Sequence, residues 1–367
     1  MDFPDSGNDM KLAMEKVEAQ TRLLSAPTPD RLNENWRFGR PHKHAASLVE
    51  LLADTKNTPS KGTVTIADAS GSADNIDKED ADSELLMATI GSDRILGLHL
   101  QRFGKGVALF LEGDIAEPIT ITYETEGLFT PTTLIIAAPG ARARIRERHI
   151  THGEGCMVCT RIIQAAEGAE ISVELEECGS GSSRAMNITN ISAVQAKVRH
   201  LTRHCNHAWA REETIAEVLH SEGDADIRLY SANRLSGNQV LDQHTRQIHT
   251  SGHSASDLLY KNVVDENATA IFAGNIFVGP GAHNTDAYQS NRNMLLSEKA
   301  TIHSLPGLEI LADKVRCSHG SASAPMDEEQ LFYLLSRGIP RQEALKLVAE
   351  GFLADATNRF HSASDND

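Results

Sequence analysis

Five short stretches of this chain repeat one pattern, in which a small or polar residue and an alanine come before alternating apolar and polar residues: Gly140-Ala141-Arg142-Ala143-Arg144-Ile145, Gly168-Ala169-Glu170-Ile171-Ser172-Val173, Asp224-Ala225-Asp226-Ile227-Arg228-Leu229, Asn267-Ala268-Thr269-Ala270-Ile271-Phe272 and Lys299-Ala300-Thr301-Ile302. Such alternation places the apolar side chains on one face of a β-strand. The five alanines are 28, 56, 43 and 32 residues apart, an irregular period of about 30 residues. This period is typical of a β-solenoid, in which each coil buries its apolar face by stacking on its neighbours.

The strand pattern around these stretches extends from about residue 85 to residue 320, with β-branched residues divided by Gly, Asn, Asp and Pro. One β-sandwich takes about 100 residues and cannot account for this length. Stacked coils can, although the pattern alone leaves open two successive sandwiches. We therefore predict a mainly β fold with a β-solenoid core over residues 85–324.

The residues before the strand region differ from it in pattern. Met10, Met14 and Val17 follow helical spacing, which predicts an amphipathic helix over residues 10–24. A second short helix is expected over residues 45–53, and the residues from 67 to 84, rich in Ser, Asp and Gly, are interpreted as a mobile loop. Residues 1–84 are thus predicted to form a helical segment that ends in this loop.

The residues after the strand region, 325–367, are predicted to form a helical hairpin. Asp327 and the two glutamates that follow it suit the start of a helix, where the helix dipole favours negative charge. Gly338 ends this helix and Pro340 suits the first turn of the next one, which continues to about residue 356. The apolar face of the first helix is formed by Leu331, Leu334 and Leu335.

The composition disfavours several classes of protein. Lys and Arg number 35 against 51 Asp and Glu, and the net charge of −16 disfavours a surface for nucleic acid or anionic membranes. No stretch approaches the roughly 20 apolar residues of a membrane helix. The acidic start, Met1–Asp5, lacks the features of a signal or transit peptide, and the five scattered cysteines are interpreted as reduced thiols. We therefore expect a cytoplasmic protein.

Cysteine and histidine residues offer candidate metal sites. Cys156 and Cys159 lack the second pair that a structural zinc site needs, and are interpreted as buried structural residues. The densest group contains His200, His204 and His207; strand alternation would place the first two on one face and the third elsewhere. Polar surface positions explain this group at least as well as a metal does. The same interpretation applies to the scattered residues His244, His249 and His253.

Cys317 and His319 form a stronger candidate. Two residues apart on a strand, they project to the same face, and soft sulfur with borderline nitrogen suits iron, copper or zinc. Two ligands alone do not make a metal site. Either another chain supplies the remaining ligands or the pair is inert.

Several segments together resemble the SufB/SufD family of the SUF iron–sulfur cluster assembly system. The similarity covers Phe277–Ser297, Leu308–Ile310, Val315–Gly320 and Asp327–Pro340, and a weaker match lies at Arg31–Phe38. It implies a right-handed parallel β-helix flanked by N-terminal and C-terminal helical segments. The resemblance is to the SufD type, because no cysteine occurs at residues 298–303, where SufB proteins carry their cluster-building cysteine.

The resemblance also implies a function. The chain would be a non-catalytic scaffold that pairs with a SufB-like subunit through its last coils and binds a SufC ATPase through its C-terminal helices, where Leu331, Leu334 and Leu335 are the candidate docking residues. His319 and Cys317 would contribute ligands to a transient iron–sulfur cluster that the partner subunit completes. No cofactor would be bound stably. ATP would bind only to the SufC partner, since this chain lacks a Gly-x-x-x-x-Gly-Lys-Ser/Thr loop.

Other possibilities remain open from the sequence. The native dimer could also be formed by two copies of this chain. A carbohydrate-active β-helix enzyme is the main catalytic alternative, but only 5% of the residues are aromatic, and sugar platforms are usually aromatic. A histidine-rich metal-binding protein is the other alternative.

Overall fold

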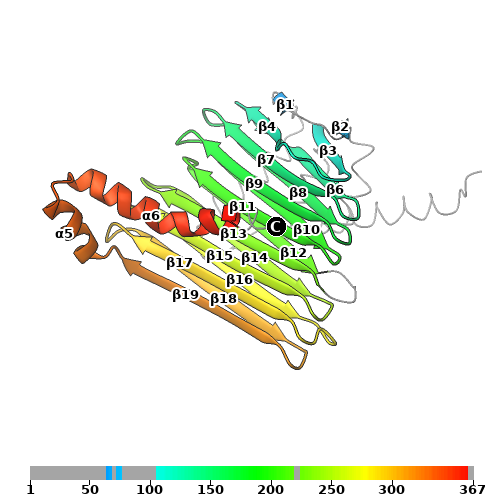
Figure 1. Cartoon of the computed structure of the whole chain (residues 1–367). Helices are drawn as coiled ribbons and strands as arrows, with labels where there is room; N and C mark the ends of the chain where they lie inside the picture. The colour runs from blue at the N-terminus through cyan, green and yellow to red at the C-terminus, as the bar shows by residue number, and fades with distance from the viewer. Residues whose placement is uncertain (1–62, 68–71, 77–104, 219–223, 363–367) are drawn as a thin grey trace, which may run out of the picture.

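The fold is described from a computed structural model, over residues 63–67, 72–76, 105–218 and 224–362. The helices predicted at residues 10–24 and 45–53, and the segment Arg31–Phe38, lie outside the described residues. Within them the chain forms a parallel β-solenoid that ends in two helices (Figure 1), which confirms the predicted fold class for this part of the chain. No helix among these residues is long and apolar enough to cross a membrane.

Two sheets face each other along the solenoid. The first contains, in spatial order, β1 (Thr63–Ala67), β4 (Ile119–Thr125), β7 (Arg142–Thr151), β9 (Glu170–Gly179), β11 (Lys197–Cys205), β13 (Asp226–Leu235), β15 (Ala255–Val264), β17 (Asp286–Leu295) and β19 (Arg316–Pro325). The second contains β2 (Ser72–Ile76), β3 (Lys105–Leu111), β6 (Pro131–Ala137), β8 (Cys156–Ala165), β10 (Arg184–Ala193), β12 (Trp209–Val218), β14 (Val240–His249), β16 (Thr269–Val278) and β18 (Thr301–Ile310). The short strand β5 (Leu128–Phe129) pairs with β8.

The repeated alanines mark the corners where a strand begins. Ala141, Ala169 and Ala225 are buried directly before β7, β9 and β13 of the first sheet, whereas Ala268 is buried before β16 of the second sheet. The spacing looks irregular because the sequence pattern mixes these two corners. The coil between Ala169 and Ala225 has its own corner alanine, Ala196, which is also buried.

The N-terminal region differs from its prediction. The sequence pattern predicts that residues 1–84 form a helical segment with a mobile loop over residues 67–84, but the structure places strands β1 and β2 at residues 63–67 and 72–76. Each pairs antiparallel with the first solenoid strand of its sheet, β1 with β4 and β2 with β3. An edge strand offers unpaired N–H and C=O groups, and pairing with it stabilises segments whose own strand signal is short.

The C-terminal helical hairpin is confirmed. The Asp327 side chain accepts a hydrogen bond from the Glu329 backbone N–H at 2.9 Å and caps α5 (Glu328–Ser336). Gly338 has φ of 80°, a left-handed conformation that glycine adopts without strain, and α6 (Arg341–Ser362) follows. Helix α6 is longer than predicted because its last turns are buried on the outer face of the first sheet, where Phe360 contacts Tyr230.

The interior of the solenoid contains polar columns as well as an apolar core. One column passes through equivalent positions of successive coils, where the amide of Asn233 donates to Asn262 at 2.8 Å, Asn262 donates to Asn293 at 3.0 Å, and Asn293 donates to Ser323 at 3.2 Å. Parallel in-register stacking produces this column, because residues one coil apart lie side by side.

The same stacking corrects two expectations about single residues. His200, His204 and His207, for which surface positions were considered, are all buried, and His207 contacts Ser183 at 2.9 Å. Cys178 and Cys205 are register partners on β9 and β11 and form a disulfide, whereas all cysteines were interpreted as reduced thiols. Both differences arise because a strand's alternation does not reveal which residues of other coils lie beside it. His249 is also buried, and His253 is exposed.

Candidate functional site at the open end of the solenoid

The solenoid ends at β18 and β19, the last strands of the two sheets. Among the described residues no strand pairs with the outer side of either one. Every residue of β19 except Cys317 is exposed, and those of β18 are at most half-buried. A strand in this position offers a row of backbone donors and acceptors to another chain. We call this last coil, formed by β18 and β19, the open end.

Cys317 and His319 occupy equivalent inward-facing positions of β19. Cys317 lies beside Ala287 and His319 beside Gln289 in the register with β17. The Cys317 side chain is half-buried against an apolar cluster that includes Ile276. Burial raises the pKa of the Cys317 thiol, and the negative charge of the neighbouring Asp286 adds to the effect. The thiol is therefore protonated at neutral pH, and a metal ion that binds it must displace the proton.

His319 is exposed and makes no hydrogen bond to any of the described residues. Its register neighbour Gln289 is only 2% exposed, yet neither its amide oxygen nor its amide nitrogen has a partner there. Gly274 provides the space for this side chain, because a Cβ at that position would lie 2.5 Å from the Gln289 oxygen. The Gln289 amide, which has no partner among the described residues, thus lies one coil further into the solenoid than the His319 imidazole.

Hydroxyl groups complete the inner lining of the open end. Ser304 of β18 donates to the Asn291 oxygen at 3.1 Å, and Ser321 of β19 donates to Ser304 at 2.8 Å. These bonds connect the two sheets where the core stops. Neither serine stands out in the sequence, although residues 317, 319, 321 and 323 share one face of a strand.

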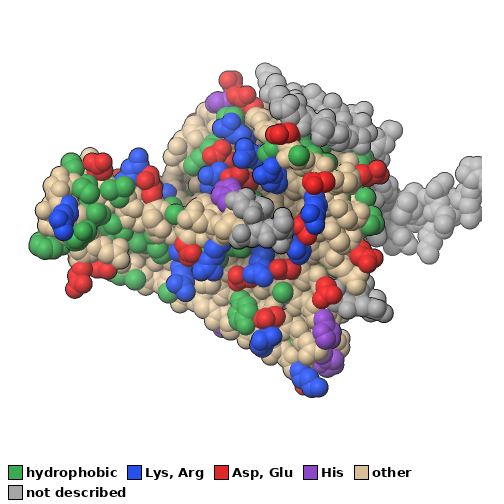
Figure 2. All heavy atoms as spheres, in the orientation of Figure 1, with side chains coloured by type: hydrophobic (Ala, Val, Ile, Leu, Met, Phe, Trp, Pro, Cys, Tyr) green, Lys and Arg blue, Asp and Glu red, His purple; other side chains and the backbone are tan. Residues whose placement is uncertain are grey.

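The three leucines predicted to dock a partner lie on the inner side of the hairpin. Leu331 is buried against Met326 and Ala344, and Leu334 and Leu335 pack partly into the same cluster. The exposed apolar side chains of α5 are instead Phe332 and Tyr333, at 72% and 57% exposure. Figure 2 shows hydrophobic side chains gathered at this end of the molecule. The helical spacing predicts the apolar face of α5 correctly, but that face packs against α6 and the end of β17.

A second set of potential metal ligands lies inside the solenoid and was not predicted from the sequence. It consists of Glu147 and His149 of β7 and Cys159 of β8. Glu147 and His149 are two residues apart on one strand face, a signal that the sequence contains. Nothing in the sequence indicated that Cys159, on the opposite sheet, would face them.

Comparisons with known proteins agree on one family. The model of the SUF system FeS cluster assembly, SufBD core domain, matches residues 120–352, a span that includes the open end and most of the hairpin. The SufBD family protein slr0076 of Synechocystis is 28% identical over 257 residues, 67% of this chain and 56% of its own length. SufD of Escherichia coli is 37% identical over 134 residues, which is 36% of this chain and 32% of that protein. SufD of Bacillus subtilis is 38% identical over 124 residues, which is 34% of this chain and 28% of that protein. These alignments thus span between about a quarter and just over half of the relatives' lengths.

Proposed function

This chain belongs to the SufB/SufD family and is of the SufD type, and from that premise we propose that it is a non-catalytic scaffold subunit for iron–sulfur cluster assembly in the cytoplasm. In this proposal it pairs with a SufB-like subunit through the open end and binds a SufC-like ATPase through its helical hairpin. A second copy of this chain is the alternative partner for the open end.

The observation that carries this proposal is the unpaired edge of the last coil. Two parallel sheets stop at β18 and β19 without a covering segment among the described residues, although both strands are ten residues long. Natural proteins usually protect such edges with charged residues, bulges or covering elements. Arg316 is the single charged residue of β19. A partner solenoid with the same coil geometry would continue both sheets and bury this edge.

The ligand set supports a transient role for the metal. Cys317 and His319 supply one sulfur and one nitrogen, a combination that suits iron, and the partner would supply the other ligands. In this proposal, the protonated thiol of Cys317 and the exposed imidazole of His319 bind no metal until the partner adds its ligands. The nascent cluster would form between the subunits and leave when the interface opens.

The hairpin supplies the proposed link to ATP. Phe332 and Tyr333 form an exposed apolar pair on α5, and the hairpin packs on the solenoid through Leu331 and Met326. Binding of ATP by two SufC subunits would draw their two hairpins together and shear the interface between the open ends. Iron and sulfide would then reach Cys317 and His319.

The proposal is tested by replacing His319 in the co-expressed complex. His319→Ala should abolish cluster formation by the purified complex, measured by visible absorption and iron content, while the subunits still co-elute. Ser318→Ala is the matched control, because Ser318 is exposed on the opposite face of the same strand and should retain the wild-type yield. A normal cluster yield in the His319→Ala complex would refute the assignment of the ligand.

A further inference from the structure

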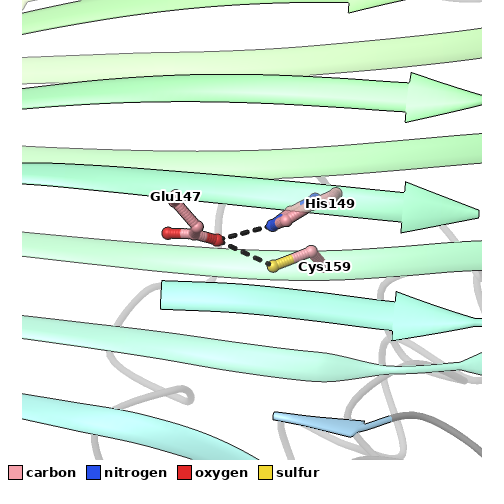
Figure 3. A group of neighbouring side chains, drawn as sticks. All are labelled: Glu147, His149 and Cys159. Atoms are coloured by element: carbon pink, nitrogen blue, oxygen red, sulfur yellow. Dashed lines mark hydrogen bonds and ion pairs between the residues drawn. The ribbon is translucent and has the colours of Figure 1, made fainter. Parts of the chain in front are cut away.

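Glu147, His149 and Cys159 converge in the interior, in a coil far along the chain from the open end (Figure 3). Their side chains are buried, and one possible ligand atom of each lies within 4.8 Å of the other two. The His149 Nε2 atom lies 2.6 Å from the Glu147 Oε1 atom, and the Cys159 thiol points to the same oxygen at 3.8 Å. Oxygen, nitrogen and sulfur donors therefore face one small volume.

Neighbouring groups fix the orientation of these donors. The Nδ1 atom of His149 lies 2.6 Å from the Glu177 carboxylate, which directs Nε2 toward Glu147. Arg161 donates through Nε to Glu147 Oε2 at 2.8 Å and holds that carboxylate in place. Asn187 donates to Glu177 at 2.7 Å. A histidine that binds a metal usually donates its other ring N–H to a carboxylate, which sets the tautomer and the ring orientation.

Hydrogen-bond geometry places the charges of this group when it holds only protons. Both ring nitrogens of His149 lie 2.6 Å from a carboxylate oxygen, and each nitrogen carries a proton because a carboxylate only accepts. Arg161 donates to Glu147 as well. Two carboxylates thus face one guanidinium and one imidazolium, and the Cys159 thiol donates to Glu147 as a neutral group.

We infer that Glu147, His149 and Cys159 form a resident site for a borderline divalent transition metal ion such as zinc or ferrous iron. On binding, the ion takes the positions of two protons, one from His149 Nε2 and one from the Cys159 thiol, and both protons leave to solvent. Two positive charges enter and two leave, so the net charge of the buried network does not change. The mixed donor set favours zinc, iron or cobalt over magnesium and calcium, which prefer oxygen ligands alone.

The burial of the site determines how it is filled. Because all three ligands are inaccessible in the folded chain, the ion enters before the coils of β7 and β8 close around it. Metal content is therefore set by the supply during folding and resists chelators afterwards. This property separates the interior site from Cys317 and His319, which are accessible at the open end.

The test is the metal content of the full chain produced in zinc-supplemented cells and purified with a chelator present. Wild type should retain about one zinc or iron ion per chain by mass spectrometry, and Cys159→Ser should fall to background. Cys156→Ser is the matched control, because Cys156 is a buried free cysteine on the same strand outside the ligand group and should retain the metal. Cys317→Ser and His319→Ala should retain it as well.

Cobalt provides a readout that does not require a change in the ligand group. Wild type produced with cobalt should show a thiolate-to-cobalt charge-transfer band, and the band should persist in Cys156→Ser and in Cys317→Ser. These variants remove the other two free cysteines, so a persistent band identifies Cys159 as the thiolate ligand even if Cys159→Ser does not fold. Wild type without stoichiometric metal from either culture would overturn the inference. Loss of the metal in Cys317→Ser would also overturn it, because the ion would then lie at the open end.

Discussion

The two ends of the solenoid are finished in different ways. At the N-terminal end, β1 and β2 pair antiparallel with the first strand of each sheet and cover both edges. At the C-terminal end, β18 and β19 carry no further strand among the described residues, and the hairpin that follows packs along the side of the solenoid instead of across its end. Stacked repeats need a covered end to remain soluble. This difference supports the proposal that the end without a covering strand among the described residues pairs with another solenoid.

The interiors of the two ends also differ. The coils of β7, β8 and β9 contain the charged group of Glu147, His149, Arg161 and Glu177, whereas the later coils contain the neutral amide column that ends at Asn293. Three changes test these contrasts.

The first test is a proline at the open edge. Alternate residues of a parallel strand direct their N–H groups to opposite sides, and the Arg316 N–H bonds to Thr285 on the β17 side. Ser321→Pro therefore removes an N–H on the open side and should weaken pairing with the partner subunit about ten- to a hundredfold, measured by titration and co-elution.

Ala322→Pro is the matched control for this change. Its N–H is directed to β17, so this substitution should destabilise the last coil of the isolated chain. Ser321→Pro loses the exposed hydroxyl bond to Ser304 but no hydrogen bond of the ladder with β17, and should lower the melting temperature less. Equal pairing by Ser321→Pro and wild type would show that the edge backbone is not the interface.

A second test uses acid to separate the two interiors. The pKa values of Glu147 and Glu177 are lowered in the folded chain, so their contribution to the free energy of unfolding is complete above the unfolded value of about 4.5 and is lost as the pH falls below it. The raised pKa of His149 acts oppositely, since its contribution is complete below about 6.5 and is lost as the pH rises through the folded value. This group is therefore most stabilising between about pH 4.5 and pH 6.5.

Hydrogen exchange can follow this effect strand by strand in chain prepared without added metal. On acidification from about pH 6 to about pH 3.5, amides of β7 to β9 should lose protection before those of β15 to β17, whose inward-facing side chains include the neutral residues Asn262 and Asn293. Simultaneous loss of protection in all coils would mean that the charged group does not set the acid stability of its own end.

A third test is confined to the hairpin. Leu331→Ala removes a buried side chain and should lower the stability of the hairpin by about 2–4 kcal/mol, seen as faster exchange in α5. Replacing the exposed Phe332 and Tyr333 with Asp should leave the exchange of α5 unchanged and abolish binding of the SufC-like partner on a sizing column. Retained binding by this double variant would place the docking surface elsewhere.

The repeating part of this fold could be predicted from the sequence, whereas contacts between residues of different coils or sheets could not. Alternation and corner alanines such as Ala141 and Ala169 indicated stacked coils, because the alternating apolar residues of each strand mark the face that it turns to the interior. Alternation could not show that His200 is buried or that Cys159 faces His149, since those contacts join strands of different coils or sheets. Likewise, helical spacing found Leu331 but could not show which side of α5 is occupied. The family resemblance supplied the pairing and docking roles of the open end and hairpin, which remain predictions.

The attachment of α6 determines where a mechanical load on the hairpin would act. Lys261 of β15 pairs with Asp355 at 2.9 Å and donates to the Phe352 carbonyl at 2.9 Å, so α6 is fastened to a strand that lies two strands inside the open end. Helix α5 is joined directly to the end of β19 by Met326 and Asp327. A pull on α5 would therefore be resisted where α6 is attached to β15, and the first bonds to break would be those between β19 and β17. A force on the hairpin would therefore turn it about its attachment to β15 and pull β19, the strand that contains Cys317 and His319, away from β17.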